Sequence, residues 1–157
     1  MEPLDPYLFG EEQVCFGCGP HNERGWRLKF FREGDDVFTD WTPEAGHDGP
    51  PGVLHGGLQA TLMDEIAGWA LGALAGCMGL TTHMSVRYYL PVRVGVPLRA
   101  SARIVSDEGR TVVVRAKLVQ EGKQRASAKI NFVVPDEETA ARIVGADLTD
   151  QMRRFLR

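Results

Sequence analysis

The chain has 157 residues, of which 43% are hydrophobic and 25% are charged, and its formal net charge is −3. This length fits one domain with a sizeable core. The small, mixed charge gives no indication of a nucleic-acid-binding surface or a polybasic membrane anchor. Three cysteines, an odd number, argue against a disulfide framework and favour a reducing cytoplasm. The N-terminus also lacks the basic start and apolar run of a signal peptide.

Residues 1–25 form a predicted lead-in that is irregular or contains a short helix. It holds a Cys-x-x-Cys pair, Cys15 and Cys18, with His21 nearby, which could begin a zinc site. A structural zinc normally has four ligands, and no second Cys/His pair follows. The thioredoxin-like pattern of a redox pair is also missing. We therefore favour a Gly- and Pro-rich turn with small buried thiols, and we predict no metal and no separate cofactor.

Alternating apolar and polar residues predict strands over 26–31 and 37–42, joined by a turn at residues 34–36. A loop rich in Gly and Pro follows over 43–52 and contains His47. Because such a loop leads to a helix start, we expect it to form a wall of a substrate site.

One long buried helix is predicted from Gly56 to about Leu80. Its apolar residues follow the i, i+3, i+4 spacing, and its other faces are also apolar. Asp64 and Glu65 are the only charged residues between Gly56 and Met78. The uninterrupted apolar segment after these two acids is too short for a membrane span, which needs about 20 apolar residues. A carboxylate in an apolar helix is costly unless it is paired or used, so this pair marks a candidate site.

Four more strands are predicted after the helix, over 81–90, 98–105, 111–119 and 125–134, as an antiparallel meander. Residues 136–157 are predicted to be a helical tail. A sheet of about five to six strands that curls around the helix would bury it, which gives an α+β fold in a single domain over 1–157. The open sheet edges and leftover apolar surface favour self-association.

Five motifs follow one another within residues 15–134. They are Cys18-Gly19-Pro20-x-Asn22, Gly25-x-x-Leu28, His55-Gly56-Gly57, Leu62-x-Asp64, and Thr81 ahead of Val86-x-Tyr88-x-x-Pro91-Val92. With this spacing the chain resembles the hotdog-fold acyl-CoA thioesterases, specifically the phenylacetate-degradation type. The resemblance implies a hotdog fold, an acyl-CoA substrate with coenzyme A as part of it, and active sites across a two-fold interface.

Thioester hydrolysis creates an oxyanion, and the free N–H groups at a helix N-terminus lie at the positive end of its dipole. Gly56 N–H is therefore predicted to polarise the thioester carbonyl, and Gly57 leaves room for the substrate. His55 is predicted to fix the turn through a side-chain hydrogen bond. Asp64 is predicted to attack the carbonyl or to activate water. Thr81, which matches a Ser or Thr of the family, is predicted to hold the water or the carboxylate.

Gly56 and Asp64 are eight residues apart, which is about 12 Å along a helix. An oxyanion donor and an attacking oxygen must both lie about 3 Å from one carbonyl centre. We therefore expect Asp64 to serve a site whose Gly56 belongs to another subunit. A dimer and a dimer of dimers both stay open.

Several alternatives remain from the sequence. Thr82 replaces Thr81 if the strand register shifts. Glu65 replaces Asp64 if the other helix face points to the site, although we favour an ion pair of Glu65 with a strand arginine such as Arg87. A capping role alone for His55 is the simpler alternative to catalysis.

The family often has an Asn six residues before the His, where this chain has Gly49. His47 and Asp48 could orient the water instead. Met84 is one of several residues that could line a pocket for an aromatic or medium-chain acyl group. A second hypothesis is a non-catalytic acyl-CoA or fatty-acid binding module, which Gly49 encourages. No hydratase motif and no helix-turn-helix segment is found.

Overall fold

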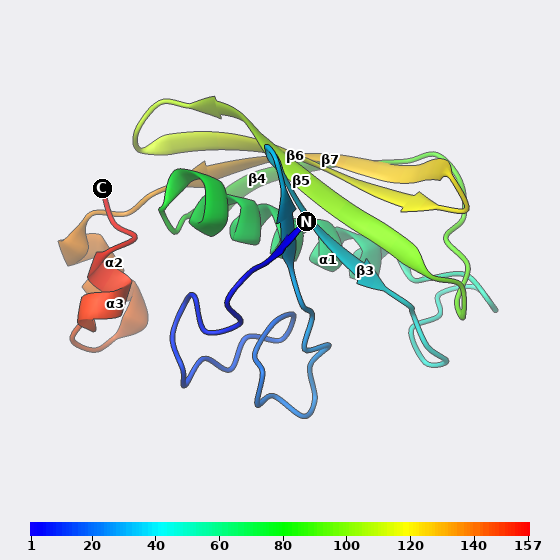
Figure 1. Ribbon diagram of the computed structural model, residues 1–157, viewed down its shortest axis with the longest axis horizontal. Helices are drawn as coiled ribbons and strands as arrows, with labels where there is room; N and C mark the ends of the chain where they lie inside the picture. The colour runs from blue at the N-terminus through cyan, green and yellow to red at the C-terminus, as the bar shows by residue number, and fades with distance from the viewer.

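The computed structural model describes residues 1–157 and consists of one antiparallel sheet packed against one long helix (Figure 1). The strands are β1 (Glu2–Pro3), β2 (Phe31–Glu33), β3 (Asp36–Trp41), β4 (Leu80–Tyr88), β5 (Leu98–Asp107), β6 (Thr111–Gln120) and β7 (Lys123–Val133). The helices are α1 (Gly56–Ala70), the π-helical turn η1 (Leu71–Ala75), α2 (Glu137–Val144) and α3 (Asp150–Arg153). The predicted α+β class is confirmed. The sheet has seven strands instead of five to six because two very short strands extend one edge.

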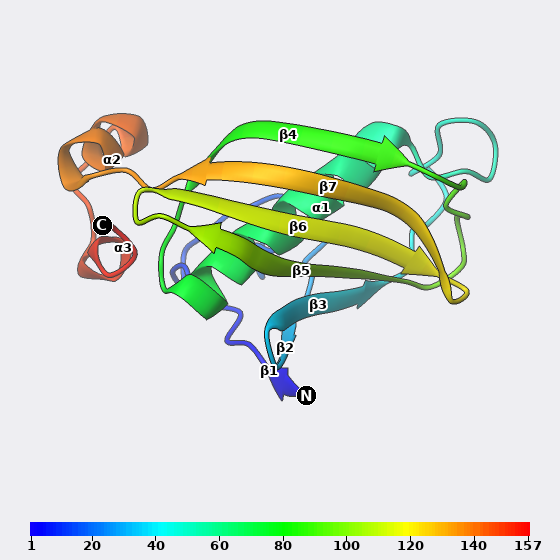
Figure 2. The same ribbon diagram turned by 90° about the horizontal axis from the view of Figure 1, so that it is seen from above.

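Helix α1 crosses one face of the sheet obliquely (Figure 2). Leu62, Met63 and Ile66 are fully buried and belong to one core with the inward side chains of the strands. These inward residues include Val112, Val114, Leu118, Ile130 and Phe132. The helical run ends at Gly76, whose φ of 61° is left-handed, so it stops four residues before the predicted end.

Strand β4 lies at the free edge of the sheet beside β7, and the order is β1-β2-β3-β5-β6-β7-β4. The predicted four-strand meander is therefore wrong for its first strand, since only β5, β6 and β7 are consecutive neighbours. The loop after β3 carries the chain to the β4 side, where α1 begins beside Tyr88, and α1 then crosses back toward β2 and β5 (Figure 2). The segment after Gly76 returns the chain to the far edge, where β4 pairs with β7 instead of β5. The outer edge of β4 has no partner within the chain.

The lead-in contains turns but no helix, and the strand predicted over 26–31 is wrong except for its last residue. The backbone N–H groups of Trp26 and Leu28 donate to the carbonyls of Phe16 and Gly17, each at 2.9 Å. These bonds tie residues 26–30 to the lead-in instead of to β3. Local alternation could not reveal this competition, because the partner is a turn ten residues away.

The C-terminal tail is helical, as predicted, but it is divided into α2 and α3 by Gly145, which has a φ of 71°. The tail packs beside the lead-in at one end of α1. Gln151 Nε2 donates to the carbonyl of Tyr7 at 3.0 Å, and the rings of Phe9 and Phe155 are 5.4 Å apart. The two ends of the chain therefore together cover the C-terminal half of the central helix.

Candidate active site

Asp64 and Thr81 come together although they lie on different elements. Thr81 Oγ1, near the start of β4, donates to Asp64 Oδ1 on α1 at 2.7 Å. Thr82 Oγ1 donates instead to the carbonyl of Asn131 at 3.1 Å, beside a register irregularity in the β4–β7 pairing. The contact expected between Thr81 and the carboxylate is present, and Thr82 does not replace it. The catalytic role of the pair stays a prediction.

A pocket of about 420 Å³ opens next to this pair. Asp64, Glu65 and Thr81 supply its polar groups together with Gln13 and two thiols. Its apolar walls come from the lead-in, α1, the residues around β4, β7 and the tail: Phe9, Trp69, Met78, Phe132 and Met152. Met84, expected to line the pocket, packs against the core instead and is absent from this lining. The pocket can hold an apolar group beside a fixed carboxylate.

The N-terminus of α1 is held by His55 and Tyr88. His55 Nδ1 accepts from the Gly57 N–H at 3.0 Å, as the predicted turn requires. Tyr88 Oη donates to the Gly56 carbonyl at 2.8 Å, and its ring lies about 3.6 Å from where a Cβ of Gly56 would be. The Gly57 N–H is therefore engaged, while Gly56 has the first, unpaired N–H of the helix. The sequence analysis named Tyr88 only as an aromatic residue of the Val86-x-Tyr88-x-x-Pro91-Val92 motif.

The two halves of the predicted site lie apart in one chain. Gly56 begins α1 and Asp64 is eight residues further along the same helix, about 12 Å at 1.5 Å per residue. Gly56 and His55 do not line the pocket beside Asp64. One chain therefore offers an oxyanion donor at one place and a carboxylate at another.

Residues 51–137, more than half of the chain, match the family model of the thioesterase superfamily. The chain belongs to this superfamily. A Caenorhabditis elegans relative named "Putative esterase" is 34% identical over 143 residues, which are 82% of this chain and 81% of that protein. Acyl-coenzyme A thioesterase THEM4 of Bos taurus is 27% identical over 146 residues, 88% of this chain. The chain spans only 60% of that protein's length.

Solved structures agree with this assignment. The crystal structure of a thioesterase superfamily protein superposes with a TM-score of 0.71 and 28% identity, over 85% of this chain and 70% of that one. A Streptococcus mutans protein bound to acetyl CoA superposes with a TM-score of 0.65 and 24% identity, over 73% of this chain and 94% of that one. A phenylacetic acid degradation-related protein from Ralstonia eutropha superposes with a TM-score of 0.63 and 20% identity, over 68% of this chain and 84% of that one. The last two identities show the fold alone, which is the hotdog fold expected from the sequence.

In this superfamily member, the loop before α1 is held by its own side chains. His47 Nδ1 accepts from the Glu44 N–H at 2.9 Å, and Asp48 accepts from the Gly46 and Gly52 N–H groups at 3.2 and 2.7 Å. These hydrogen bonds stabilise the loop. His47 and Asp48 do not line the pocket beside Asp64 of the same chain.

Position 49 directly faces the helix cap. A Cβ added to Gly49 would lie 3.3 Å from His55 Cα and 3.5 Å from its ring. A family Asn at this position would therefore project toward the cap, next to Gly56. In this chain that side of the cap has no amide group.

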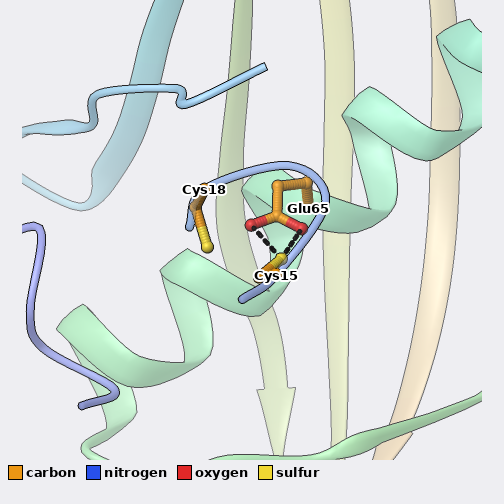
Figure 3. Close-up of side chains that lie close together, drawn as sticks. All are labelled: Cys15, Cys18 and Glu65. Carbon is orange, nitrogen blue, oxygen red and sulfur yellow. Dashed lines mark hydrogen bonds between the residues drawn. The ribbon is translucent and has the colours of Figure 1, made fainter. Parts of the chain in front are cut away.

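Glu65 lies beside Asp64 in the pocket but has different neighbours. Its carboxylate is close to the thiols of Cys15 and Cys18 (Figure 3). Burial raises the pKa of Glu65 to about 7, and the nearby Cys18 thiol lowers the pKa of Cys15 to about 5. The ion pair expected with Arg87 is wrong. Arg87 lies on β4 and lines a separate hollow of about 510 Å³ on the polar side of the sheet.

Arg103 and Arg115 line that hollow together with Arg87. Arg99 lies on β5, as Arg103 does, but outside the lining of the hollow. Arg103 pairs with Asp36, and Arg99 makes a two-pronged ion pair with Asp40 at 2.7 Å. The pairing agrees with a surface role for these two arginines. No helix of the protein has the length and hydropathy needed to cross a bilayer.

Proposed function

We propose that this protein is an acyl-CoA thioesterase that hydrolyses the thioester of an aryl- or medium-chain acyl-CoA to the free acid and coenzyme A. The carboxylate of Asp64, fixed by Thr81 on the wall of a mainly apolar pocket, is the observation on which the proposal depends. An apolar pocket beside an oriented carboxylate suits an acyl group whose carbonyl reaches the acid. The resemblance in motifs supports the phenylacetate-degradation type, and the acyl-CoA thioesterase name of the cattle relative supports the substrate class.

In this reaction the Gly56 N–H polarises the thioester carbonyl, and Asp64 either attacks the carbonyl carbon or takes a proton from an attacking water. If Asp64 takes the proton from water, the carbon–sulfur bond breaks and that proton passes to the leaving thiolate of coenzyme A. If Asp64 attacks, the carbon–sulfur bond breaks to leave an anhydride on Asp64, the thiolate takes a proton from solvent, and water then cleaves the anhydride to the free acid and the carboxylate. Thr81 holds the carboxylate in place. Coenzyme A enters as part of the substrate, and the hydrolysis uses no separate cofactor.

The site is completed by a second copy of the chain. The separation of about 12 Å along α1 prevents Gly56 and Asp64 of one chain from serving the same carbonyl. The free edge of β4 offers unpaired backbone groups, and exposed apolar side chains lie on it and just after it: Leu80, Tyr88, Tyr89 and Leu90. Pairing of two β4 edges would cover this surface and bring two α1 helices alongside each other.

A thiol-release assay over a panel of aryl- and alkyl-CoA esters tests the function. Wild-type protein should release coenzyme A, and Asp64→Asn should lose at least about 100-fold in kcat while binding the ester normally. Asp147→Asn is the matched control, because Asp147 is an exposed carboxylate with no hydrogen-bond partner in the fold. Absence of release from every ester, with binding intact, would favour the acyl-CoA binding module that Gly49 suggests.

A further inference from the structure

Three side chains that can ligate a metal meet at the lead-in side of the pocket. One ligating atom each of Cys15, Cys18 and Glu65 lies within 4.8 Å of the other two. Cys15 Sγ is 3.5 Å from Oε1 and 3.4 Å from Oε2 of Glu65 (Figure 3). With zinc–sulfur and zinc–oxygen bonds of about 2.3 and 2.0 Å, tetrahedral geometry separates neighbouring sulfur and oxygen ligands by about 3.5 Å. The spacing of Cys15 and Glu65 therefore matches that of two zinc ligands, and Cys18 lies within 4.8 Å of both.

The loop of the lead-in is shaped around this carboxylate. A Cβ on Gly17 would lie only 2.5 Å from Glu65 Cδ, so a side chain at that position would displace the acid. The Gly19 N–H donates to the Cys15 carbonyl at 2.9 Å and closes the turn that brings both thiols to one side. The loop curves over the Glu65 side chain in Figure 3. Two glycine positions thus allow Cys-x-x-Cys to enclose a residue from the middle of α1.

The cluster has no cationic partner in the chain. Glu65 takes part in none of the ion pairs, and no Lys, Arg or His lines the pocket. Trp69, one turn further along α1, lines the same pocket, is 2% exposed, and has an indole N–H without an acceptor. A donor of this kind commonly orients the carboxylate ligand of a metal. Two thiols and an acid, of which Cys18 is buried and the other two are partly buried, therefore lie together beside the Trp69 N–H without a compensating charge.

We propose that Cys15, Cys18 and Glu65 bind a soft divalent cation, with zinc as the best-suited ion. Two thiolates and one carboxylate have a charge of −3, which a divalent ion reduces to −1, and the costly unpaired acid becomes a ligand. Thiolate ligands select zinc over magnesium or calcium. Water occupies the fourth position, near Gln13 Oε1, which is 3.5 Å from Cys18 Sγ. With three protein ligands and one water the site is open, and the ion ties the lead-in to α1 and fixes one wall of the pocket.

A Cys15–Cys18 disulfide is the competing chemistry. It would need an oxidant, and it would leave the carboxylate of Glu65 buried without a partner. The metal accounts for all three groups, whereas the disulfide accounts for two. The two possibilities give opposite results in a metal-binding experiment under reducing conditions.

The test is metal content and cobalt absorption of the full chain, so it does not depend on the hydrolase proposal. Protein purified with zinc and without chelators should hold about one zinc per chain. Co²⁺ should replace the zinc and give a thiolate-to-cobalt charge-transfer band. Cys15→Ser should raise the Co²⁺ dissociation constant at least about 100-fold, and Glu65→Gln at least about 10-fold. Cys77→Ala is the matched control, because this third cysteine is buried outside the cluster.

Chelation should also lower the melting temperature of the wild-type protein but not that of Cys15→Ser. Folded, reduced wild-type protein that takes up neither zinc nor cobalt overturns the proposal, and this result requires no variant. A cobalt band that is unchanged in Cys15→Ser and Glu65→Gln overturns it as well. A Cys15–Cys18 disulfide that forms in the presence of zinc and excludes the metal also overturns the proposal.

Discussion

Thr81 Oγ1 and Asp64 Oδ1 are 2.7 Å apart and connect the free edge strand β4 to the middle of the buried helix α1. The hydroxyl donates, so the carboxylate is the acceptor and is held in one orientation. A carboxylate with a fixed direction is a better nucleophile or base than one that rotates freely. Loss of this hydrogen bond should therefore lower the rate of the proposed reaction measurably.

Replacing Thr81 with Val should lower kcat by roughly 10-fold, because a hydrogen bond to a charged group typically contributes about 1.5–3 kcal/mol and this one is partly exposed to water. Thr81→Ser should restore most of the rate. Thr82→Val is the control, since Thr82 donates to the Asn131 carbonyl and not to the acid. Equal rates for Thr81→Val and Thr82→Val would show that the contact has no catalytic importance.

Gly56→Pro should abolish turnover while the fold persists. Proline removes the N–H proposed to bind the oxyanion, and the first helical position tolerates it. His55, with φ −55° and ψ 132°, already has the conformation that a residue before proline needs. Removal of one oxyanion donor should cost about 100- to 1,000-fold in kcat. Gly56→Ala keeps the N–H and meets Tyr88 only at ordinary contact distance, so it should retain much more activity.

The same variant tests the shared site. Mixing inactive Gly56→Pro with inactive Asp64→Asn should restore activity, because one of the two sites in each mixed dimer has both wild-type groups. Random exchange of subunits would restore about a quarter of the wild-type sites. Mixtures that remain inactive, although mass measurement shows mixed dimers, would contradict a site built from two subunits.

Two glycines on the same helical run should respond oppositely to alanine. Gly68 has open space around its Cβ position, so Gly68→Ala should raise the free energy of unfolding by roughly 0.5–1 kcal/mol. A Cβ on Gly72 would lie 2.5 Å from the Phe9 ring, which also packs against Trp69 and Phe155. Gly72→Ala should therefore lower the free energy of unfolding by about 1–3 kcal/mol. Chemical denaturation of both variants measures the difference, and equal effects would disprove the close packing at Gly72.

Asp107 should contribute a pH-dependent increment of stability. The hydrogen bond from Arg157, at 2.6 Å, lowers the pKa of Asp107 below its ordinary value. The stabilisation is therefore fully present above about pH 4 and is lost as the pH falls through the lowered pKa. Asp107→Asn should cost about 0.2–1 kcal/mol at pH 7, as expected for a partly exposed ion pair, and less at pH 2, where more of the carboxylate is protonated. Thermal unfolding at both pH values, with Asp147→Asn as control, checks this; a penalty that is constant with pH would rule out the charge effect.

The central helix and the strands after it could be predicted because their signals are local. Helical spacing of apolar residues marks α1, β-branched residues mark β6, and apolar–polar alternation marks β7. The position of β4 could not be predicted in this way. Its neighbour depends on the segments before and after α1, which carry the chain to that edge of the sheet and back to it, and no local pattern encodes their path.

Within the site, the Thr81–Asp64 contact was one of two possibilities that the family resemblance implied for Thr81, and the His55 hydrogen bond to the turn was predicted as well. The partners of Glu65 were not predicted, because Cys15 and Cys18 are about 50 residues away and reach the acid only when the lead-in folds over α1. Tyr88 was likewise seen only as an aromatic residue, and its hydroxyl contact with the Gly56 carbonyl depends on tertiary structure. The signal that pointed toward Glu65 was energetic: a second acid in an apolar helix needs a partner.

The hydrogen bond at the start of α1 also determines which nitrogen of the His55 ring carries the proton. Because Nδ1 of His55 accepts the Gly57 N–H, the neutral ring keeps its hydrogen on Nε2. His47 is in the same tautomer, since its Nδ1 accepts from the Glu44 N–H. Each imidazole can thus donate toward solvent or substrate, but neither has a lone pair free to deprotonate water. Neither of these two histidines therefore competes with Asp64 for the role of base in the proposed reaction.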